Sequence, residues 1–212
     1  MGILFEHVVP DPARQVIGKL PDRLLNAFYL AGGTGLALQI GHRYSDDFDF
    51  FTPDAFDTDA LKAGIRAAGA FKVFQESPGT LEGRVDGTRL FFCHYPYPLI
   101  AGTEDWGRVR LASVVDIALM KLSAIAGRGN RKDFVDLYFL KDRIGWEELF
   151  SLFEKKFRGS GENMYHIVKS FTYFDDARKE PMPKMIVECH WERVEDYFTD
   201  LQKKAAKMFL SR

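Results

Sequence analysis

The chain has 212 residues, a formal net charge of −1, 46% hydrophobic residues and 14% aromatic residues. This hydrophobic content excludes a disordered chain, and the length allows one larger domain or two small ones, each with a core. The near-neutral charge gives no global attraction to nucleic acid, so contact with nucleic acid needs a local basic face. Two cysteines far apart in the sequence, no signal-peptide pattern and no apolar run of ~20 residues favour a cytoplasmic protein that does not cross a membrane.

The first half of the chain predicts alternating helices and strands. Apolar spacing and turn residues indicate a helical stretch with Pro21 in a first helical turn, then a strand, a helix, a strand and a helix. These elements are expected at residues 11–28, 28–31, 34–42, 48–51 and 57–69. Three further strands are expected at 71–76, 79–85 and 88–95, with Asp86-Gly87 as a tight turn. The connection over 96–112, rich in proline and glycine, is expected to be irregular.

The pattern changes at Ser113, after which nearly all of the chain is expected to be helical. Helical spacing predicts helices at 113–127, 131–143, 146–157, 162–174 and 191–210. The expected fold class is therefore α+β, with a small mixed sheet flanked by helices and followed by a helical C-terminal region. We expect an α/β core over residues 1–110 and the helical region over 111–212.

An Asp-x-Asp pair, Asp47 and Asp49, falls on the strand expected near 48–51. Residues two apart on a strand point to the same face, so both carboxylates converge on one point while Phe48 and Phe50 face the core. Two adjacent like charges are costly unless a cation neutralises them. Oxygen ligands at this spacing suit Mg²⁺, or Mn²⁺ in its place. Asp46 is out of phase with the pair and is assigned to the preceding turn.

Gly32, Gly33 and Thr34 lie between an expected strand and an expected helix. Glycines there allow the backbone to approach a ligand closely, and a helix N-terminus offers N–H groups to an anion. Ser45 could add a hydroxyl. Either signal alone is more often ordinary turn geometry or surface. Their combination on neighbouring strands predicts a metal and phosphate site.

Two blocks of the sequence resemble a known family. The stretch GGTGLAL…GHRYSDDFDFF, at 32–51, resembles the first motif of the nucleotidyltransferase superfamily that includes DNA polymerase β. Its form with His42-Arg43 ahead of Ser-x-Asp-x-Asp-Phe-Phe resembles the AbiEii/AbiGii toxin family. The block DIALMKLSAIAGRGNRKDFVDLYFL, at 116–140, is similar to the same family, with a central lysine, an arginine in the connection and Lys-Asp on the next helix.

The resemblance implies a polymerase-β-like nucleotidyltransferase domain whose cleft the helical region completes. Nucleoside monophosphate would pass from a nucleoside triphosphate (NTP) to an acceptor hydroxyl, with Mg²⁺ held by Asp47 and Asp49. The expected acceptor is an RNA end, with tRNA foremost, and a cognate antitoxin is the expected protein partner. The resemblance assigns catalytic roles also to Lys121, Asp133 and Asp136. It assigns nucleotide binding to Gly32, Gly33, Thr34, His42, Arg43, Ser45, Arg128 and Lys132.

Simpler interpretations stay open for several of these residues. His42-Arg43 could end a helix, where positive charge is favoured, and Lys121 could extend from an apolar helix to water. Asp133 could cap its own helix, and Asp136 could pair with Lys132 at i, i+4 spacing. Asp116, three residues after Ser113, is better explained as part of a helix cap than as a catalytic acid.

The sequence departs from the superfamily at its third carboxylate. Polymerase-β-like enzymes usually take this group from a later strand, here the one expected at 88–95, which contains no acid. Glu82, Asp86 or His94 could substitute, or the substrate could supply the base. Two alternatives to an RNA-modifying enzyme follow: a catalytically degenerate module that binds a nucleotide or a partner, and a nucleotidyltransferase acting on a small molecule.

Overall fold

The computed structural model describes residues 3–210, with side chains described as far as residue 208. The chain divides into two compact units, unit 1 (Met1–Ile117) and unit 2 (Ala118–Arg212). The division falls within helix α5 (Val114–Gly127), a few residues after the position expected from the sequence. The assignment of functional roles to 1–110 and 111–212 stays a prediction.

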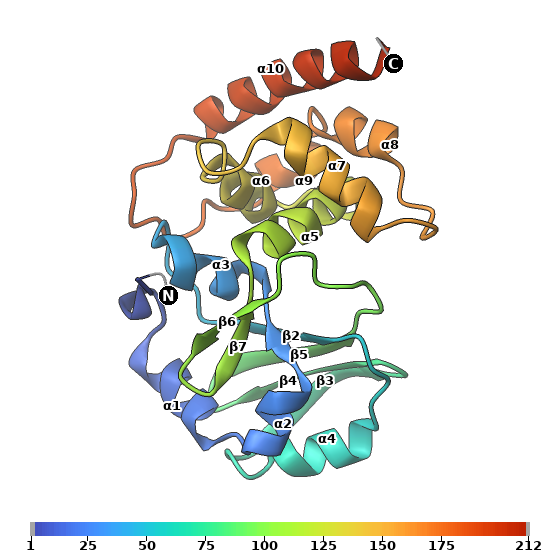
Figure 1. The fold of residues 1–212 in the computed structure, drawn as a ribbon. Helices are drawn as coiled ribbons and strands as arrows, with labels where there is room; N and C mark the ends of the chain where they lie inside the picture. The colour runs from blue at the N-terminus through green and yellow to red at the C-terminus, as the bar shows by residue number, and fades with distance from the viewer. Residues whose placement is uncertain (1–2, 211–212) are drawn as a thin grey trace. The chain divides into compact units, whose positions relative to one another are not determined.

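The strands of unit 1 form one mixed sheet (Figure 1). They are β1 (Tyr29–Leu30), β2 (Phe48–Thr52), β3 (Phe71–Ser77), β4 (Thr80–Val85), β5 (Thr88–His94), β6 (Thr103–Trp106) and β7 (Val109–Ala112). Their order across the sheet is β3-β4-β5-β2-β1-β7-β6. β2 pairs with β5, and β1 with β7, in parallel; the other neighbours are antiparallel. The mixed sheet confirms the predicted α+β class.

The helices of unit 1 precede the sheet or connect its first strands. They are η1 (Glu6–Val8), α1 (Asp11–Lys19), α2 (Asp22–Ala27), α3 (Gly32–Ile40) and α4 (Thr58–Ile65). The expected helical stretch at 11–28 is broken because Leu20, which precedes a proline, is extended at ψ 141°. Pro21 is consequently the N-cap of α2 and does not lie in its first turn. Asp57 caps α4 by accepting hydrogen bonds from the amides of Asp59 and Ala60.

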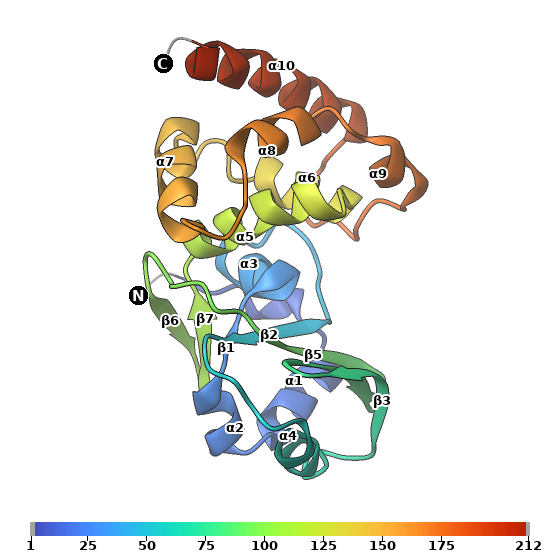
Figure 2. The same cartoon turned by 90° about the vertical axis from the view of Figure 1, so that its right-hand side faces the viewer.

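Alternate residues of the central strands build the core of unit 1. Phe48 and Phe50 on β2, and Leu90 and Phe92 on β5, are fully buried. The rings of Phe50 and Phe92 stack with centroids 5.1 Å apart. Helices α1, α2 and α4 pack on this face of the sheet (Figure 2). The residues in the opposite phase, including Asp49, are only partly buried, so the predicted alternation is confirmed.

The connection expected to be irregular contains the hairpin of β6 and β7. Its turn is made by Gly107, at φ +57°, and Arg108, with Trp106 paired to Val109. β7 lies beside β1, where Leu30 pairs with Leu111. The expectation of irregular structure is therefore confirmed over 96–102 and wrong over 103–112, because β7 joins the sheet by pairing with β1, about 80 residues earlier, rather than through a local pattern.

Unit 2 is helical, as predicted. Besides most of α5 it contains α6 (Arg131–Tyr138), α7 (Trp146–Lys156), α8 (Met164–Ser170), α9 (Asp175–Lys179) and α10 (Trp191–Leu210). Its core is aromatic: Phe134, Trp146, Phe171 and Phe198 contact one another. The short α9 was not predicted from the sequence. In the described part of the chain, no helix is long and apolar enough to cross a membrane.

Candidate nucleotide and metal site

The turn from β1 into α3 places a carboxylate directly against a glycine. The amide of Ala31 donates to the carbonyl of Asp49, 3.0 Å away, which continues the pairing of β1 with β2. Gly32 then has φ +61°, and a Cβ at this position would lie 2.2 Å from Asp49 Oδ2. Only glycine satisfies both the left-handed backbone and this close approach. Helix α3 begins at Gly32 itself, two residues earlier than the sequence predicts.

The second glycine of the turn lies against an arginine. A Cβ at Gly33 would be 2.1 Å from Arg43 Nη2. Arg43 is 4% exposed and donates through Nη1 to the carbonyl of Tyr44, 3.1 Å away. His42 beside it is 1% exposed. His42 and Arg43 follow the end of α3, but both are buried, unlike charged residues at a solvated helix terminus. The Arg43 guanidinium lies beside the glycine turn.

Two hydroxyl groups tie α3 to the start of β2. The hydroxyl oxygens of Thr34 and Ser45 are 2.7 Å apart, and Thr34 Oγ1 also bonds to the carbonyl oxygen of Asp47. Because a carbonyl only accepts, Thr34 donates to Asp47 and Ser45 donates to Thr34. Thr34 is fully buried. In this structure both hydroxyls position Asp47, and their predicted contact with a nucleotide stays a prediction.

Asp47 and Asp49 lie at the start of β2 with their side chains 40% and 25% exposed. A third charged group joins them from the neighbouring strand β5. Nη1 of Arg89 is 3.2 Å from Asp49 Oδ1 and 3.9 Å from Asp47 Oδ2. The sequence interpretation missed Arg89, although its alternation with the buried Leu90 could have placed it on the face of the carboxylates.

Arg89 is itself held by a carboxylate and a ring. Its Nε donates to Glu82 Oε1 at 2.8 Å, and its guanidinium carbon lies 5.6 Å from the ring centroid of Phe91. The pKa of Arg89 is raised: burial lowers it, but the hydrogen bond to Glu82 and the charges of Asp49 and Glu82 outweigh burial. A permanent positive charge therefore lies beside the Asp-x-Asp pair.

The three residues that could substitute for a third carboxylate differ in their position relative to Asp49. Glu82 and Asp49 both pair with Phe91, from opposite sides, so they share the face of the sheet. Asp86 lies in the β4–β5 turn at φ 48°, with Lys19 Nζ 3.7 Å from its carboxylate. His94 pairs with Thr52, in the opposite phase to Asp49. Among the described residues, no group of three His, Cys, Asp or Glu could hold a metal ion, so Glu82 does not complete a triad.

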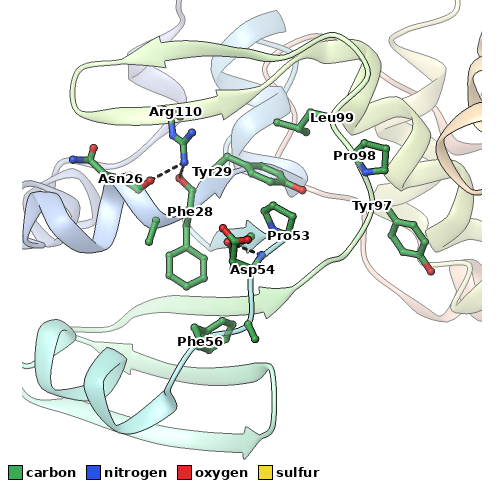
Figure 3. Close-up of a pocket in the computed structure, with 13 residues that line it drawn as sticks. Asn26, Phe28, Tyr29, Pro53, Asp54, Phe56, Tyr97, Pro98, Leu99 and Arg110 are labelled. Carbon is green, nitrogen blue, oxygen red and sulfur yellow. Dashed lines mark hydrogen bonds between the residues drawn. The ribbon is translucent and has the colours of Figure 1, made fainter.

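A cavity of about 470 Å³ opens at the other end of β1 and β2 (Figure 3). Aromatic rings of Phe28, Phe56 and Tyr97 line it, together with Asp54 and Arg110. Arg110 donates to the carbonyls of Asn26 and Phe28 at 2.8 and 3.2 Å. Tyr29, the first residue of β1, lines the cavity, and the glycine turn follows the last residue of β1. The cavity therefore lies at the opposite end of β1 from the glycine turn and is separate from the carboxylate pair.

In unit 2, three of the predicted site residues form a buried ion network. Lys121 Nζ is 2.7 Å from Asp133 Oδ1 and 2.7 Å from Asp136 Oδ2, with both carboxylates fully buried. Arg128 adds a bond from Nε to Asp133 Oδ2 at 2.9 Å while its side chain stays 56% exposed. Burial raises the pKa of Asp133, but the charge of Lys121 and the hydrogen bond from Arg128 outweigh it, so this pKa is lowered. Lys121 does not extend to water as a solvated lysine would, and Lys132 is exposed.

Comparison with known proteins connects this geometry to a family. Residues 21–101, which contain the glycine turn, the Asp-x-Asp pair and Arg89, match the model of the nucleotidyl transferase AbiEii toxin, type IV toxin–antitoxin system. The chain is also 42% identical over 194 residues to the uncharacterized protein aq_aa25 of Aquifex aeolicus (strain VF5), covering 88% of this chain and 90% of that one. The chain belongs to the AbiEii nucleotidyltransferase family.

Solved structures share the fold of this chain. A Helicobacter pylori protein proposed to be a nucleotidyltransferase matches with a TM-score of 0.55 and 16% identity, over 93% of this chain and 96% of the other. JHP933 from Helicobacter pylori matches with a TM-score of 0.53 and 16% identity, over 96% and 97%. At this identity the likeness concerns the fold alone, and it extends over both units.

Proposed function

We propose that this AbiEii-family protein is an active nucleotidyltransferase that moves a nucleoside monophosphate from an NTP to an RNA end, with tRNA the foremost acceptor. We further propose that it acts as the toxin of a pair in which a cognate antitoxin protein opposes it. The donor nucleotide binds in unit 1, with Mg²⁺ or Mn²⁺ at Asp47 and Asp49. Family membership supports the reaction class and the toxin role. The RNA acceptor and the antitoxin are proposals that follow from the family resemblance, and the metal and nucleotide contacts are proposals drawn from the residues.

One observation carries the proposal: a carboxylate pair with part of its surface exposed lies against the N-terminus of a helix. Asp49 Oδ2 approaches Gly32 so closely that no side chain fits there. The amides at the start of α3 attract phosphate oxygens, and two adjacent carboxylates attract a divalent cation. The donor set of two carboxylate oxygens beside a triphosphate is the kind that Mg²⁺ takes, so the residues fit the metal.

The reaction can be written for this chain's residues. A hydroxyl oxygen of the acceptor forms a bond to the α-phosphorus, the bond from that phosphorus to the bridging oxygen breaks, and pyrophosphate leaves with the electron pair. The hydroxyl proton passes to solvent or to a substrate phosphate, because β5 supplies no carboxylate. When bound, the metal supplies positive charge to the phosphate oxygens. Gly33 and Thr34 would orient the triphosphate, and Arg43 would keep positive charge beside it.

Unit 2 offers cations for a second contact with phosphate. Arg128 is fixed at Asp133 yet more than half exposed, and Lys132 is exposed. A guanidinium held by one carboxylate can still donate to a phosphate through its remaining N–H groups. We therefore keep Arg128 and Lys132 as proposed phosphate contacts, with Lys121, Asp133 and Asp136 as the network that positions Arg128.

The test is transfer of label from α-³²P-labelled NTPs to a tRNA pool with Mg²⁺. The key variant is Asp49→Asn, which removes one negative charge with little change in shape. Loss of one preorganised electrostatic group in such reactions costs about 100- to 1000-fold in rate, so we expect at least this decrease. The matched control is Asp46→Asn, because Asp46 is an exposed neighbour that lies outside the pair.

The control should label tRNA at the wild-type rate. Equal labelling by the wild type and Asp49→Asn would contradict the proposed site. Labelled protein or labelled small molecule, with unlabelled tRNA, would keep the reaction class and overturn the RNA acceptor.

A second candidate function is nucleotide binding without transfer. The observation that favours it is that β5, the strand on which a polymerase-β-like enzyme usually carries its third acid, contains no acid and places Arg89 beside the carboxylate pair. Calorimetry that shows NTP binding lost in Asp49→Asn, together with no labelled product from any acceptor, would establish this alternative. Transfer by the wild-type chain would exclude it.

A further inference from the structure

One nitrogen atom of Arg89 lies between the two carboxylates that would bind a metal. Nη1 is 3.2 Å from Asp49 and 3.9 Å from Asp47, distances that fit one hydrogen-bonded ion pair and one looser ion pair. The guanidinium carries a charge that is not lost at any ordinary pH. The carboxylate pair is therefore already partly neutralised by a group of the chain itself.

The strand register explains why the guanidinium occurs at this place. β2 and β5 run parallel, with Phe48 beside Leu90 and Asp49 beside Phe91. One residue earlier on each strand, Asp47 and Arg89 are neighbours that point to the same face. The position that can supply another carboxylate to the pair supplies a cation in this chain.

Arg89 is anchored independently of the pair. Its Nε bonds to Glu82 at 2.8 Å, whereas a different nitrogen, Nη1, contacts Asp49, and the Phe91 ring lies beneath the guanidinium. A metal that displaces Nη1 from Asp49 would leave the Nε–Glu82 bond intact. The guanidinium would then stay beside the bound metal rather than swing into solvent.

The local charge points to a single cation. Asp47, Asp49 and Glu82 with Arg89 leave at most two negative charges, which one divalent ion neutralises. Two-metal sites place their ions about 3.5–4 Å apart, which requires carboxylates around both ions. Here the space beside the pair is occupied by a positive group, so a second ion would meet repulsion and lack ligands.

We propose that Arg89, held by Glu82, takes the place of a second metal ion, so that the site binds one divalent cation per chain. This inference rests on the proposed function, because it concerns the same carboxylate pair. Arg89 is a positioning residue for the bound ion and the phosphate charge. It also lowers the affinity of the site for the ion, because it competes for Asp49.

The experiment is to count bound Mn²⁺ by electron paramagnetic resonance on the full chain, with and without a non-hydrolysable NTP analogue. The wild type should bind one ion at this site in both conditions. Arg89→Asp should bind two with the analogue, because a third carboxylate then joins the pair in place of the cation. The Asp49→Asn variant serves as the background measurement: any ions that it still binds lie outside this site and are subtracted from the wild-type count.

Two further variants have opposite expected effects on affinity. Arg89→Gln should bind the first Mn²⁺ about tenfold more tightly, because one repelling charge is removed. Glu82→Gln should bind it several-fold more weakly, because Arg89 then adds its full charge to the pair. Arg66→Gln is the matched control, since Arg66 is an exposed arginine at the end of α4 away from the pair. Its affinity should equal that of the wild type.

Two ions on the wild-type chain with the analogue would overturn the inference, as would weaker binding by Arg89→Gln in a chain whose thermal unfolding is unchanged. The count does not depend on turnover. An inactive chain that binds one ion would contradict the proposed activity and support the inference, and an active chain that binds two would do the reverse.

Discussion

Asp47 and Asp49 in unit 1 and Asp133 and Asp136 in unit 2 are closely spaced aspartate pairs in very different surroundings. The first pair keeps 40% and 25% of its side-chain surface exposed, beside one guanidinium that also serves Glu82. The second pair is fully buried around Lys121, with Arg128 closing one side. The first pair can exchange its partner for a ligand. The second would have to break buried ion pairs to do so, which is costly.

The difference indicates that aspartates have two different roles in this chain. Carboxylates at the start of a strand, next to a glycine turn, keep part of their surface exposed to solvent. Carboxylates one helical turn apart on α6 point into a helical core, where each needs a cation in contact. Substitutions in each pair and its surroundings should therefore affect stability and metal binding differently.

Replacement of Lys121 by Met should have the largest effect on stability. It removes the ammonium group that contacts both buried carboxylates, and breaking a buried ion pair in this way costs about 3–5 kcal/mol. Urea unfolding followed by fluorescence in a Trp106→Phe background reports on Trp146 and Trp191, both in unit 2. Lys132→Met is the control on α6, where an exposed lysine should matter by less than about 0.5 kcal/mol. Similar values for both variants would show that the network contributes little.

Replacement of Gly32 by Ala should have a smaller effect on stability and a direct effect on the carboxylate pair. The left-handed backbone costs alanine about 1–2 kcal/mol, and the new Cβ would displace Asp49. We expect lower thermal stability together with weaker Mn²⁺ binding. Gly18→Ala is the control: this glycine lies in α1, a Cβ added to it would meet no heavy atom within 4 Å, and alanine there should stabilise by about 0.5–1 kcal/mol. Unchanged Mn²⁺ affinity in Gly32→Ala would show that the geometry of the glycine turn does not affect metal binding at the carboxylate pair.

Acid should reveal the smallest effect, confined to unit 2. The pKa of Asp133 is lower in the folded chain than its usual value of 3.8. Its stabilising contribution is therefore complete above that value and is lost as pH falls through the lowered pKa. The free energy of unfolding of unit 2 should decrease more steeply below pH 4 in the wild type than in Asp133→Asn. Parallel pH profiles for the two chains would contradict the ion network.

The sequence predicted those parts of the fold and site that depend on local pattern. Alternation in FDFF placed Phe48 and Phe50 in the core and both aspartates of the pair on the other face, and helical spacing predicted the main helices of unit 2. It missed β6 and β7, since a four-residue strand gains its stability from a distant partner such as Leu30. It also placed the start of α3 two residues late, because the left-handed conformation of Gly32 depends on contact with Asp49.

The amino-acid sequence by itself determined the family, the mixed α and β character of unit 1, and which carboxylates share a face, because these follow from motif and periodicity. Only the tertiary structure decided what surrounds each charge. Arg89 and Glu82 reach the Asp-x-Asp pair through strand register, and Lys121 joins Asp133 and Asp136 through the packing of α5 on α6. Electrostatic interactions are strongest between groups in contact and weaken with distance, so the role of each aspartate depends on neighbours that sequence spacing does not reveal.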